Sequence, residues 1–372
     1  MLLFSLFALG TWPALLDLSA LHGRHPTHAY LDYCSAVLLV AGVLALGSGE
    51  PLADAGSASV MLAGGGGVLL MFGNLSMQRA LLMGVPLTIV LPLQGSLTVV
   101  IGTTINYFLQ PERSEPHLLS AGVVAFLLAI LLSAAAQRTH ERSIGATRRL
   151  MRPPTMRSVP LACCHQCTET PLIADQAATH ATSETTAVAP SSWPPYPLRS
   201  RSPGLNGLCV AAGGGVCFGF FSPAFNIAVN DELGWIQAAG GKPLGLFAAN
   251  LYFCLCFTLS GWVANLAIMA CPPPGAASSS LLAYLRSPCR GRALATLAGV
   301  VCALGNGSQF LGGSLAGFAA ADLVQAFPLV GTLWGIGCFG EFRGASRQVF
   351  CLLGSMYTAF IAAVALLAVS AR

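Results

Sequence analysis

Long apolar segments dominate this sequence, and most of them could each form one membrane-spanning helix. A helix that crosses the hydrocarbon core of a bilayer needs about 20 mostly apolar residues. Only 9% of the residues are charged and 55% are hydrophobic, whereas a soluble domain has about 25% charged residues. We therefore predict an all-α polytopic membrane protein with ten transmembrane helices. The ten segments are approximately residues 1–20, 30–48, 58–80, 85–108, 117–136, 205–228, 245–270, 291–313, 318–339 and 347–370.

The first apolar segment has two possible interpretations. A signal peptide begins with a positively charged region and ends at a small-residue cleavage site. The segment 1–20 lacks both features, so we interpret it as a spanning helix.

Basic residues are distributed unevenly between the predicted loops. If the loops alternate in side from an outer N-terminus, 15 of the 18 Lys and Arg residues lie on the inner side. Because cytoplasmic loops have the excess of Lys and Arg, this pattern places both termini outside and the long central loop in the cytoplasm. The formal net charge of +4 is spread over membrane loops and does not indicate a nucleic-acid partner.

The central segment, residues 137–204, differs in composition from the rest of the chain. Its second half is rich in Pro, Ser, Thr and Ala. Such a segment cannot bury enough apolar surface to offset chain entropy, and we predict a disordered cytoplasmic linker. It separates a first five-helix unit, residues 1–136, from a second, residues 205–372.

Short motifs recur in the same order in the two units. "GNLS" at 73–76 returns as "GNGS" at 305–308, "LPLQGSL" at 91–97 as "FPLVGTL" at 327–333, and "WPA" at 12–14 as "SPA" at 222–224. A repeat with an odd number of spans inserts its second copy upside down. Such inverted repeats are typical of secondary transporters, whose substrate site lies between the repeats near the membrane midplane. Chance similarity between apolar segments is the alternative.

Several motifs together resemble the plant ureide permease family of the drug/metabolite transporter superfamily. They include "GTWPALL", "GNLSMQ", "GFFSPAFNIAVNDE" and the stretch from Gly305 to Arg347. The resemblance implies proton-coupled import of allantoin and of related oxo-nitrogen heterocycles such as uracil, hypoxanthine or xanthine, at the plasma membrane. It also implies a GxxxxGK nucleotide-binding stretch in the central loop, which this sequence lacks, so we predict no ATP binding and no cofactor. Asp17 and Arg79 depart from the family pattern, which has a small neutral residue and an aromatic residue there.

Amide side chains are the leading candidates for binding such a substrate. Allantoin and uracil are small, neutral and rich in N–H and C=O groups, and one Asn or Gln amide both donates and accepts. Asn74 and Gln78 share one helix face, and Asn306 and Gln309 occupy the corresponding part of the second unit. The alternative is that these amides bond to one another and hold the helices together.

Aromatic side chains provide flat surfaces on which a heterocycle can stack. Trp12, Phe310 and Trp334 lie in predicted spans and are the candidates for this contact. The alternative is a role in the core or at the membrane interface.

Carboxylates in or beside the spans are a second signal. A charge at mid-bilayer costs about 2.5–3.5 kcal/mol or more and is usually functional. We predict that Asp322, in "AAADLVQAFPLV", couples transport to protons, with a structural aspartate as the alternative. Asp32 begins a span and is predicted to be a gate or a cap, and Glu341 to stabilise the cytoplasmic face. Asp17 has no assigned role.

Four prolines are predicted to act as hinges. Each removes a backbone hydrogen bond from a helix, and transporters use such breaks as bending points. The four residues are Pro13, Pro92, Pro223 and Pro328.

Other classes of function find less support. "CCHQC" at 163–167 is too compact for a zinc site, and we predict no metal. The motifs of intramembrane hydrolases are absent from the sequence, so we do not expect an enzyme. A sugar or nucleotide-sugar carrier of the same superfamily and a non-transporting membrane sensor are the alternatives to a permease.

Overall fold

All regular secondary structure in the described part of the chain is helical. The structure, a computed structural model, describes residues 1–51, 56–85, 87–109, 115–150, 205–272, 278–289, 291–321, 324–325, 327–340, 342 and 344–370. Within these ranges nine helices are long and apolar enough to cross a membrane. They are α1 (Leu2–Leu21), α2 (Pro26–Ser48), α3 (Ser57–Leu82), α4 (Leu87–Leu109), α5 (Pro116–Leu150), α6 (Leu205–Asn230), α8 (Leu246–Ala270), α10 (Arg292–Ala316) and α13 (Arg347–Ser370). The shorter helices are α7 (Trp235–Ala238), α9 (Leu281–Arg286), α11 (Phe318–Ala321) and α12 (Pro328–Gly337).

The ninth predicted span, residues 318–339, does not form one continuous helix. It contains α11 and α12 as separate helices. Before α11, Gly317 has a φ of 88°, a backbone conformation that glycine adopts without steric cost. Pro328 lies in the first turn of α12, where its missing N–H leaves no helical bond unmade. These boundary signals interrupt the apolar run, so the prediction of an uninterrupted helix here is wrong. The prediction that Pro328 removes a hydrogen bond from a helix is wrong too, because it begins α12.

Helix α5 is longer than predicted. It runs for 35 residues, whereas the prediction ended this span at residue 136. A helix of this length measures about 52 Å, and the hydrocarbon core of a bilayer is about 30 Å thick, so α5 continues beyond it. The start of the predicted linker, residues 137–150, is therefore helical, and residues 151–204 lie outside the described residues.

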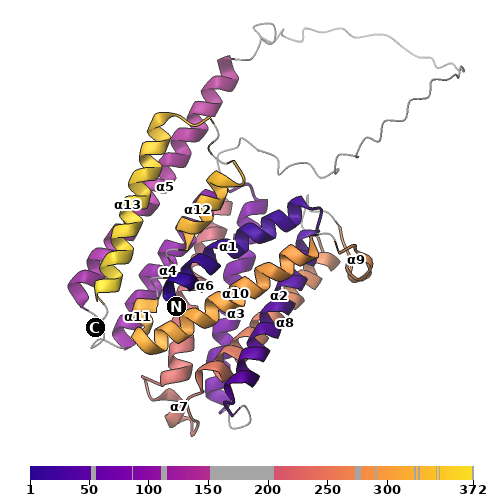
Figure 1. The fold of residues 1–372 in the computed structure, drawn as a ribbon, viewed down its shortest axis with the longest axis vertical. Helices are drawn as coiled ribbons and strands as arrows, with labels where there is room; N and C mark the ends of the chain where they lie inside the picture. The colour runs from indigo at the N-terminus through magenta and orange to yellow at the C-terminus, as the bar shows by residue number, and fades with distance from the viewer. Residues whose placement is uncertain are drawn as a thin grey trace, which may run out of the picture.

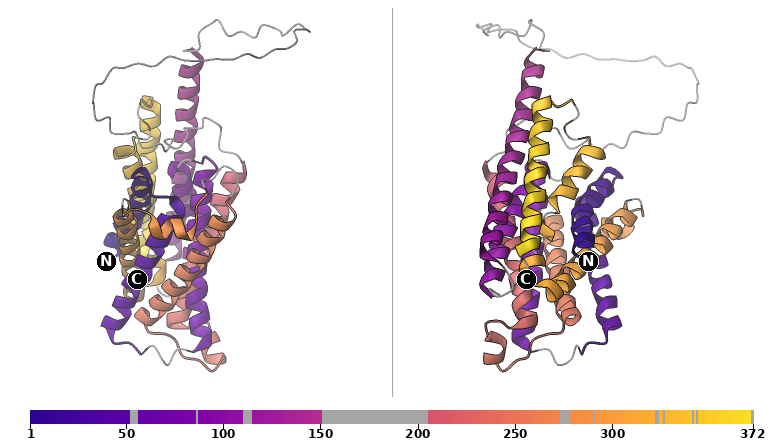
Figure 2. Two further views of the ribbon diagram at one scale, coloured as in Figure 1. Left: turned by 90° about the vertical axis from the view of Figure 1, so that its right-hand side faces the viewer. Right: turned by 60° about the vertical axis from the view of Figure 1, so that its left-hand side comes forward.

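The long helices form one large bundle with a pair of helices beside it (Figure 1). In the bundle α3 packs against α6 and α8, while α10 packs against α1 and α2. Helices α2 and α8 also contact each other, and α4 packs against α6. The pair consists of α5 and α13, which run side by side (Figure 2) and share a core that includes Phe126 and Phe360.

Glycines allow the closest helix contacts in the bundle. A Cβ atom at Gly67 of α3 would overlap the carbonyl oxygen of Phe253 in α8. In the same way, a Cβ atom at Gly299 of α10 would overlap the carbonyl oxygen of Tyr33 in α2. Small residues at such crossings let two membrane helices approach backbone to backbone.

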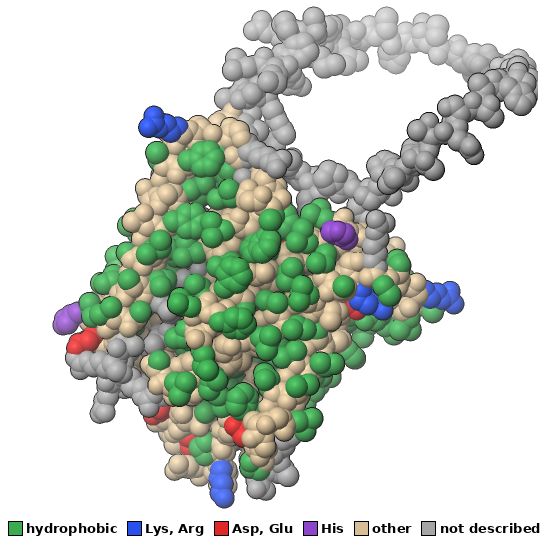
Figure 3. Space-filling view, viewed as in Figure 1, with side chains coloured by type: hydrophobic (Ala, Val, Ile, Leu, Met, Phe, Trp, Pro, Cys, Tyr) green, Lys and Arg blue, Asp and Glu red, His purple; other side chains and the backbone are tan. Residues whose placement is uncertain are grey.

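A hydrophobic surface covers the middle of the molecule. On the face drawn in Figure 3, hydrophobic side chains spread over the centre, and charged side chains lie near the ends and margins. Large exposed apolar residues include Leu3, Leu46, Met61, Phe108 and Val263. An apolar surface of this extent needs an apolar surrounding, as expected for an integral multi-pass membrane protein.

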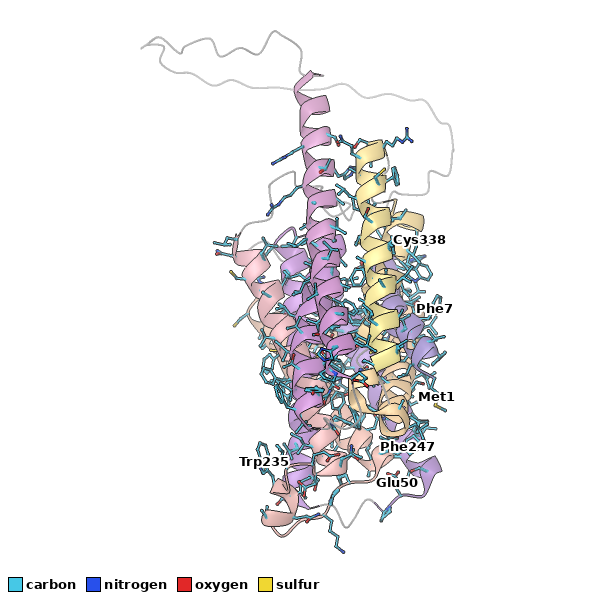
Figure 4. The ribbon with its side chains drawn as sticks, turned by 90° about the vertical axis from the view of Figure 1, so that its left-hand side faces the viewer. Met1, Phe7, Glu50, Trp235, Phe247 and Cys338 are labelled. Atoms are coloured by element: carbon cyan, nitrogen blue, oxygen red, sulfur yellow. The ribbon has the colours of Figure 1, made fainter. Side chains whose placement is uncertain are left out.

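The two halves are joined by a polar contact at one end of the bundle. Glu50, in the turn after α2, accepts hydrogen bonds from the backbone N–H groups of Phe247 and Ala248, each at 2.9 Å. Figure 4 labels Glu50 and Phe247 at this end. The carboxylate caps the N-terminus of α8, where both the free N–H groups and the helix dipole favour an anion.

Candidate functional site

A cavity opens between α1, α2 and α3, with an accessible volume of about 50 Å³. Other residues of its lining come from the last turns of α1 and α3 and the first turn of α2. The cavity therefore lies toward the end of the bundle where α1 turns into α2. The residues that give it its chemical character are Trp12, Pro13, Asp17, Tyr30 and Gln78.

Three predicted residues meet in this cavity. Trp12 and Gln78 were predicted to bind substrate, and Pro13, inside α1, to act as a hinge. The proline leaves a gap in the hydrogen bonds of α1 beside the cavity. Tyr30 and Asp17 complete the polar and aromatic lining. Sequence reasoning assigned no site role to these two residues.

A second cavity of about 350 Å³ lies between α4, α5 and α6. Its lining includes the predicted hinge Pro92, and apart from Ser133 and Cys209 all of its residues are apolar. Specific ligand sites need a few well-placed polar groups to orient the ligand. The smaller cavity meets this requirement better than the larger one.

A hydrogen-bonded network links Asn74 and Asn306 next to Trp12 of the first cavity. The amide nitrogen of Asn74 donates to the hydroxyl of Tyr33 at 3.3 Å, and that hydroxyl donates to the sulfur of Cys302 at 3.0 Å. Asn306 also donates to Cys302, at 3.5 Å. The ring of Trp12 stacks on Tyr33 with centroids 5.1 Å apart. The two amides thus join α3, α2 and α10, which agrees with the alternative that these amides hold the helices together. Trp12 links this network to the cavity.

Gln309 stands apart from the other predicted amides. Its side chain is only 1% exposed, and neither its amide nitrogen nor its amide oxygen has a hydrogen-bond partner among the described residues. Leaving a buried polar group unsatisfied costs about 1–3 kcal/mol. Whether Gln309 contacts substrate stays a prediction.

Gln94, inside "LPLQGSL", is a buried amide that the sequence reasoning missed. Its nitrogen donates to the hydroxyl of Ser76 at 3.1 Å, while its oxygen has no partner in the described part of the chain. The signal available in the sequence was a glutamine in the middle of an apolar run.

Two predicted stacking residues instead contact other protein groups. The Phe310 ring lies on that of Phe225 with centroids 3.6 Å apart and an interplanar angle of 5°. It also contacts the rings of Phe221 and Phe253. Trp334 of α12 donates from Nε1 to the hydroxyl of Thr11 in α1 at 3.2 Å. Neither aromatic residue lines the cavity.

Asp32 lies in a buried ionic cluster. Arg24 donates to it from Nε at 2.9 Å, Tyr284 from its hydroxyl at 2.9 Å, and Arg292 lies 3.4 Å away. Burial, together with the hydrogen bond to Asp32, raises the pKa of Tyr284 above its ordinary value. A tyrosine phenol is protonated at neutral pH, and that of Tyr284 donates to the carboxylate. The cluster joins the start of α2 to the segment before α10; whether Asp32 is a gate stays a prediction.

The remaining predicted residues are placed as follows. Pro92 and Pro223 lie inside α4 and α6. Asp322 and Glu341 lie outside the described residues. Among the residues that the structure describes, no group of His, Cys, Asp and Glu side chains is arranged to hold a metal, and "CCHQC" at 163–167 lies outside them.

The bundle of long apolar helices defines a multi-pass membrane protein. The sequence matches the ureide permease family over residues 29–157 and 199–370. It is 37% identical to ureide permease 2 of Arabidopsis thaliana, with 99% of this chain and 96% of the relative covered. It is 37% identical to ureide permease 1 of the same plant, with 99% and 95% covered. It is 35% identical to probable ureide permease A3 of Vigna unguiculata, with 93% and 96% covered.

These matches extend over almost the whole length of both partners. The chain belongs to the ureide permease family. No solved structure matches it.

Proposed function

We propose that this chain is a secondary transporter that imports ureides such as allantoin, and related heterocycles such as uracil, together with protons. Membership of the ureide permease family supports the class of substrate. The observation that carries the proposal is the cavity inside a bundle of membrane helices, where Trp12 and Tyr30 supply aromatic rings and Gln78 supplies an amide. Ureides and nucleobases are flat or nearly flat, and they need both donors and acceptors, which an amide provides.

The proposed architecture is two inverted five-helix repeats, with α11 and α12 together as the ninth span. The two backbone contacts at glycines support it. Gly67 and Gly299 are separated along the chain by the same offset as "GNLS" and "GNGS". Their contact partners are Phe253 of α8 and Tyr33 of α2. The contact between α3 and α8 thus has its counterpart between α10 and α2.

A second pair of contacts supports the same correspondence. A Cβ atom at Gly73 of α3 would overlap the Phe218 ring of α6. A Cβ atom at Gly305 of α10 would lie 3.2 Å from the Ala8 side chain of α1. The two glycines are the first residues of "GNLS" and "GNGS", and Ala8 and Phe218 are separated by the same offset as "WPA" and "SPA". The contact between α3 and α6 therefore has its counterpart between α10 and α1.

These offsets favour a transport cycle with alternating access, captured here in one state. The equivalent of Phe310 in the first half is Gln78, and that of Phe225 is Leu15. At one end of the bundle the two phenyl rings stack, whereas at the other end Gln78 lines an open cavity. The open end holds the turn with Arg24, on the predicted cytoplasmic side. We infer that the state is open inward, with Phe225 and Phe310 as the outer gate.

Within the proposed site, the four predicted amides have different roles. Gln78 lines the cavity, and Gln309 has a buried amide whose donors and acceptor are unmet by the described residues. Asn74 and Asn306 hold the network that supports Trp12. Trp334 and Phe310 contact substrate in this scheme only when the bundle rearranges, because both now contact other side chains. Pro13 and Pro223 allow their helices to bend.

A sugar-phosphate cargo is less well supported. Recognition of phosphate relies on Arg or Lys side chains, and no Arg or Lys is among the described residues that line the cavity. Coupling to protons through Asp322 and residence in the plasma membrane, with a cytoplasmic central loop, belong to the proposal as expectations from the sequence.

An uptake assay tests the proposal. Cells deficient in nucleobase import would express the chain and receive labelled allantoin or uracil at several pH values, with and without a proton uncoupler. We expect saturable, uncoupler-sensitive uptake that Gln78→Ala lowers. Gln237→Ala removes an exposed amide from α7 and should leave uptake unchanged. Absence of uptake of both compounds, or uptake indifferent to the uncoupler, contradicts the transport or the coupling part respectively.

A further inference from the structure

The cavity between α4, α5 and α6 has no role in the proposed transport site. Its volume is about 350 Å³, and its lining is apolar apart from Ser133 and Cys209. An apolar cavity stays dry, and an empty one destabilises the structure around it. Because a cavity of about 150 Å³ holds one benzene ring, this cavity has room for roughly fourteen carbon atoms. The lining therefore suits a stretch of hydrocarbon chain.

The position of this cavity gives it access to membrane lipid. Its lining comes from the first two turns of α4 and α6, for example Ile89 and Leu208, and from Ile130 of α5. Leu131 follows Ile130 on α5 and is 68% exposed, and Leu205, one turn before Leu208 on α6, is 75% exposed. Large apolar side chains that are exposed on a multi-pass membrane protein contact lipid. The cavity is thus continuous with the lipid-facing surface.

A positive charge lies next to the cavity on α5. Arg138 comes four residues after Ala134, which is part of the lining, and therefore shares its helix face. Side chains of a helix lean toward its N-terminus, which here is the direction of the cavity. Arg138 is exposed, and the described part of the chain gives it no ion-pair or hydrogen-bond partner. Residues 138–142 contain two arginines and one glutamate, so this segment keeps a positive charge.

We propose that the cavity binds an acyl chain of an anionic phospholipid from the surrounding bilayer, and that Arg138 pairs with the phosphate of its headgroup. The apolar walls accept the chain, and a guanidinium group can form two parallel hydrogen bonds with a phosphate. Basic residues at the cytoplasmic ends of membrane helices recognise anionic headgroups in this way. The bound chain also contacts Pro92 of α4, where the helix lacks a backbone hydrogen bond. This inference does not depend on what the chain transports.

Lipid binding to the purified full-length protein tests the headgroup contact. Native mass spectrometry would compare dioleoylphosphatidylglycerol, which is anionic, with dioleoylphosphatidylcholine, which has the same acyl chains and no net charge. The wild type should prefer the anionic lipid, and Arg138→Gln should lower this preference about fivefold, the effect of one basic residue at a membrane surface. Arg286→Gln removes the same charge from an exposed position of α9, far from α5 (Figure 1), and should leave the preference unchanged. The same preference in the wild type and Arg138→Gln overturns the contact.

Filling the cavity tests the binding of the acyl chain. Ala134→Phe adds a ring to the lining and should weaken the binding of phosphatidylglycerol to the level of Arg138→Gln or below. Ala121→Phe adds the same ring to an exposed position of the same helix and should bind the lipid as the wild type does. Undiminished binding by Ala134→Phe overturns the assignment of the cavity.

Cys209 provides a measurement that needs no substitution in the cavity. Its exposed thiol is part of the lining, and Cys351 of α13 is an exposed thiol outside it. In detergent micelles, added phosphatidylglycerol should slow the modification of Cys209 by N-ethylmaleimide in a saturable way and leave Cys351 unaffected, as peptide mass spectrometry would show. No protection of Cys209 at saturating lipid overturns the proposal. A fatty acyl thioester on Cys209, which hydroxylamine releases, also overturns it, because the occupant would then be a covalent modification.

Discussion

The run of four glycines at 64–67 allows a sharp test of how the helices pack. Gly65 is exposed, and a Cβ atom there meets no described atom within 4 Å. Gly67, two residues further on in the same helix, is buried, and a Cβ atom there would overlap the backbone of Phe253. Alanine at the two positions has the same chemistry and a similar helix propensity, so any difference between the variants reports the contact alone.

The expected effects have opposite signs. Alanine is favoured over glycine inside a helix by about 1 kcal/mol, so Gly65→Ala should be neutral or stabilising by up to about that amount. In Gly67→Ala the new methyl group would overlap a carbonyl oxygen, and a backbone atom cannot rotate aside. Overpacking costs about 1–3 kcal/mol and occasionally more. We expect Gly67→Ala to be less stable than Gly65→Ala by about 1–3 kcal/mol, and less stable than the parent by up to about 2 kcal/mol, because the gain in propensity offsets about 1 kcal/mol of the strain.

The same comparison applies to the second half. Gly299→Ala should be destabilising like Gly67→Ala, since its Cβ atom would overlap the backbone of Tyr33. Gly307→Ala in the same helix is its control, because its nearest neighbour is a Leu44 methyl group at an ordinary 3.5 Å. Unfolding of the purified variants by SDS in mixed micelles measures all four. Equal stability of Gly67→Ala and Gly65→Ala would refute the proposed backbone contact between α3 and α8.

Three further predictions concern the charged and aromatic residues. Asp32→Asn leaves a buried guanidinium without its anion and should destabilise the fold by about 3–5 kcal/mol, measured by the same unfolding assay; an unchanged midpoint would contradict the ion pair. Phe310→Leu removes ring stacking worth about 0.5–1.5 kcal/mol and should open the outer end more often. An impermeant maleimide should then label a cysteine introduced as Ser222→Cys faster in Phe310→Leu than in the protein that carries Ser222→Cys alone. Asp322→Asn should abolish accumulation of substrate but leave exchange measurable, and full accumulation by this variant would remove Asp322 from the coupling mechanism.

Much of the fold was predictable because membrane helices are specified by simple rules. Apolar runs of about 20 residues identify the spans, and nine such helices appear in the described part of the chain. The error at 318–339 arose because hydropathy outweighed the local signals of Gly317 and Pro328. The error at the end of α5 arose because hydropathy marks where a helix leaves the membrane and says nothing of how far the helix continues.

The site was less predictable, because side-chain partners depend on packing that a sequence does not display. Asn74 and Gln78 share a helix face, yet Asn74 bonds within the protein and Gln78 lines the cavity. Phe310 has a flat aromatic ring that suits stacking on a heterocycle, but this ring stacks on that of Phe225. In each case the role of the residue depends on the distance between two side chains on different helices, and a sequence does not give that distance.

The difference between Gln78 and Phe310 leads to a final prediction about the direction of access. If these two residues are equivalent in inverted repeats, a phenyl ring at position 78 should close the inner end, just as Phe310 is proposed to close the outer end. In Gln78→Phe the new ring would face Trp12 and Leu16 across a cavity of only about 50 Å³. We expect the ring to fill the cavity and to close the inner end. Aromatic contacts of this kind stabilise a pair of side chains by about 0.5–1.5 kcal/mol, which shifts a two-state equilibrium by about two- to thirteenfold.

Accessibility from the inner side distinguishes closure from simple loss of the amide. A cysteine introduced as Ala20→Cys lies in the cavity lining near the end of α1, and an impermeant maleimide reaches it in inside-out vesicles when that end is open. We expect fast labelling in the parent and in Gln78→Leu, which loses the amide without gaining a ring, and slow labelling in Gln78→Phe. Both substitutions should lower uptake, so uptake alone cannot separate them. Equally fast labelling of the two variants would mean that position 78 is not the inner counterpart of Phe310, and the assignment of the two gates would have to be abandoned.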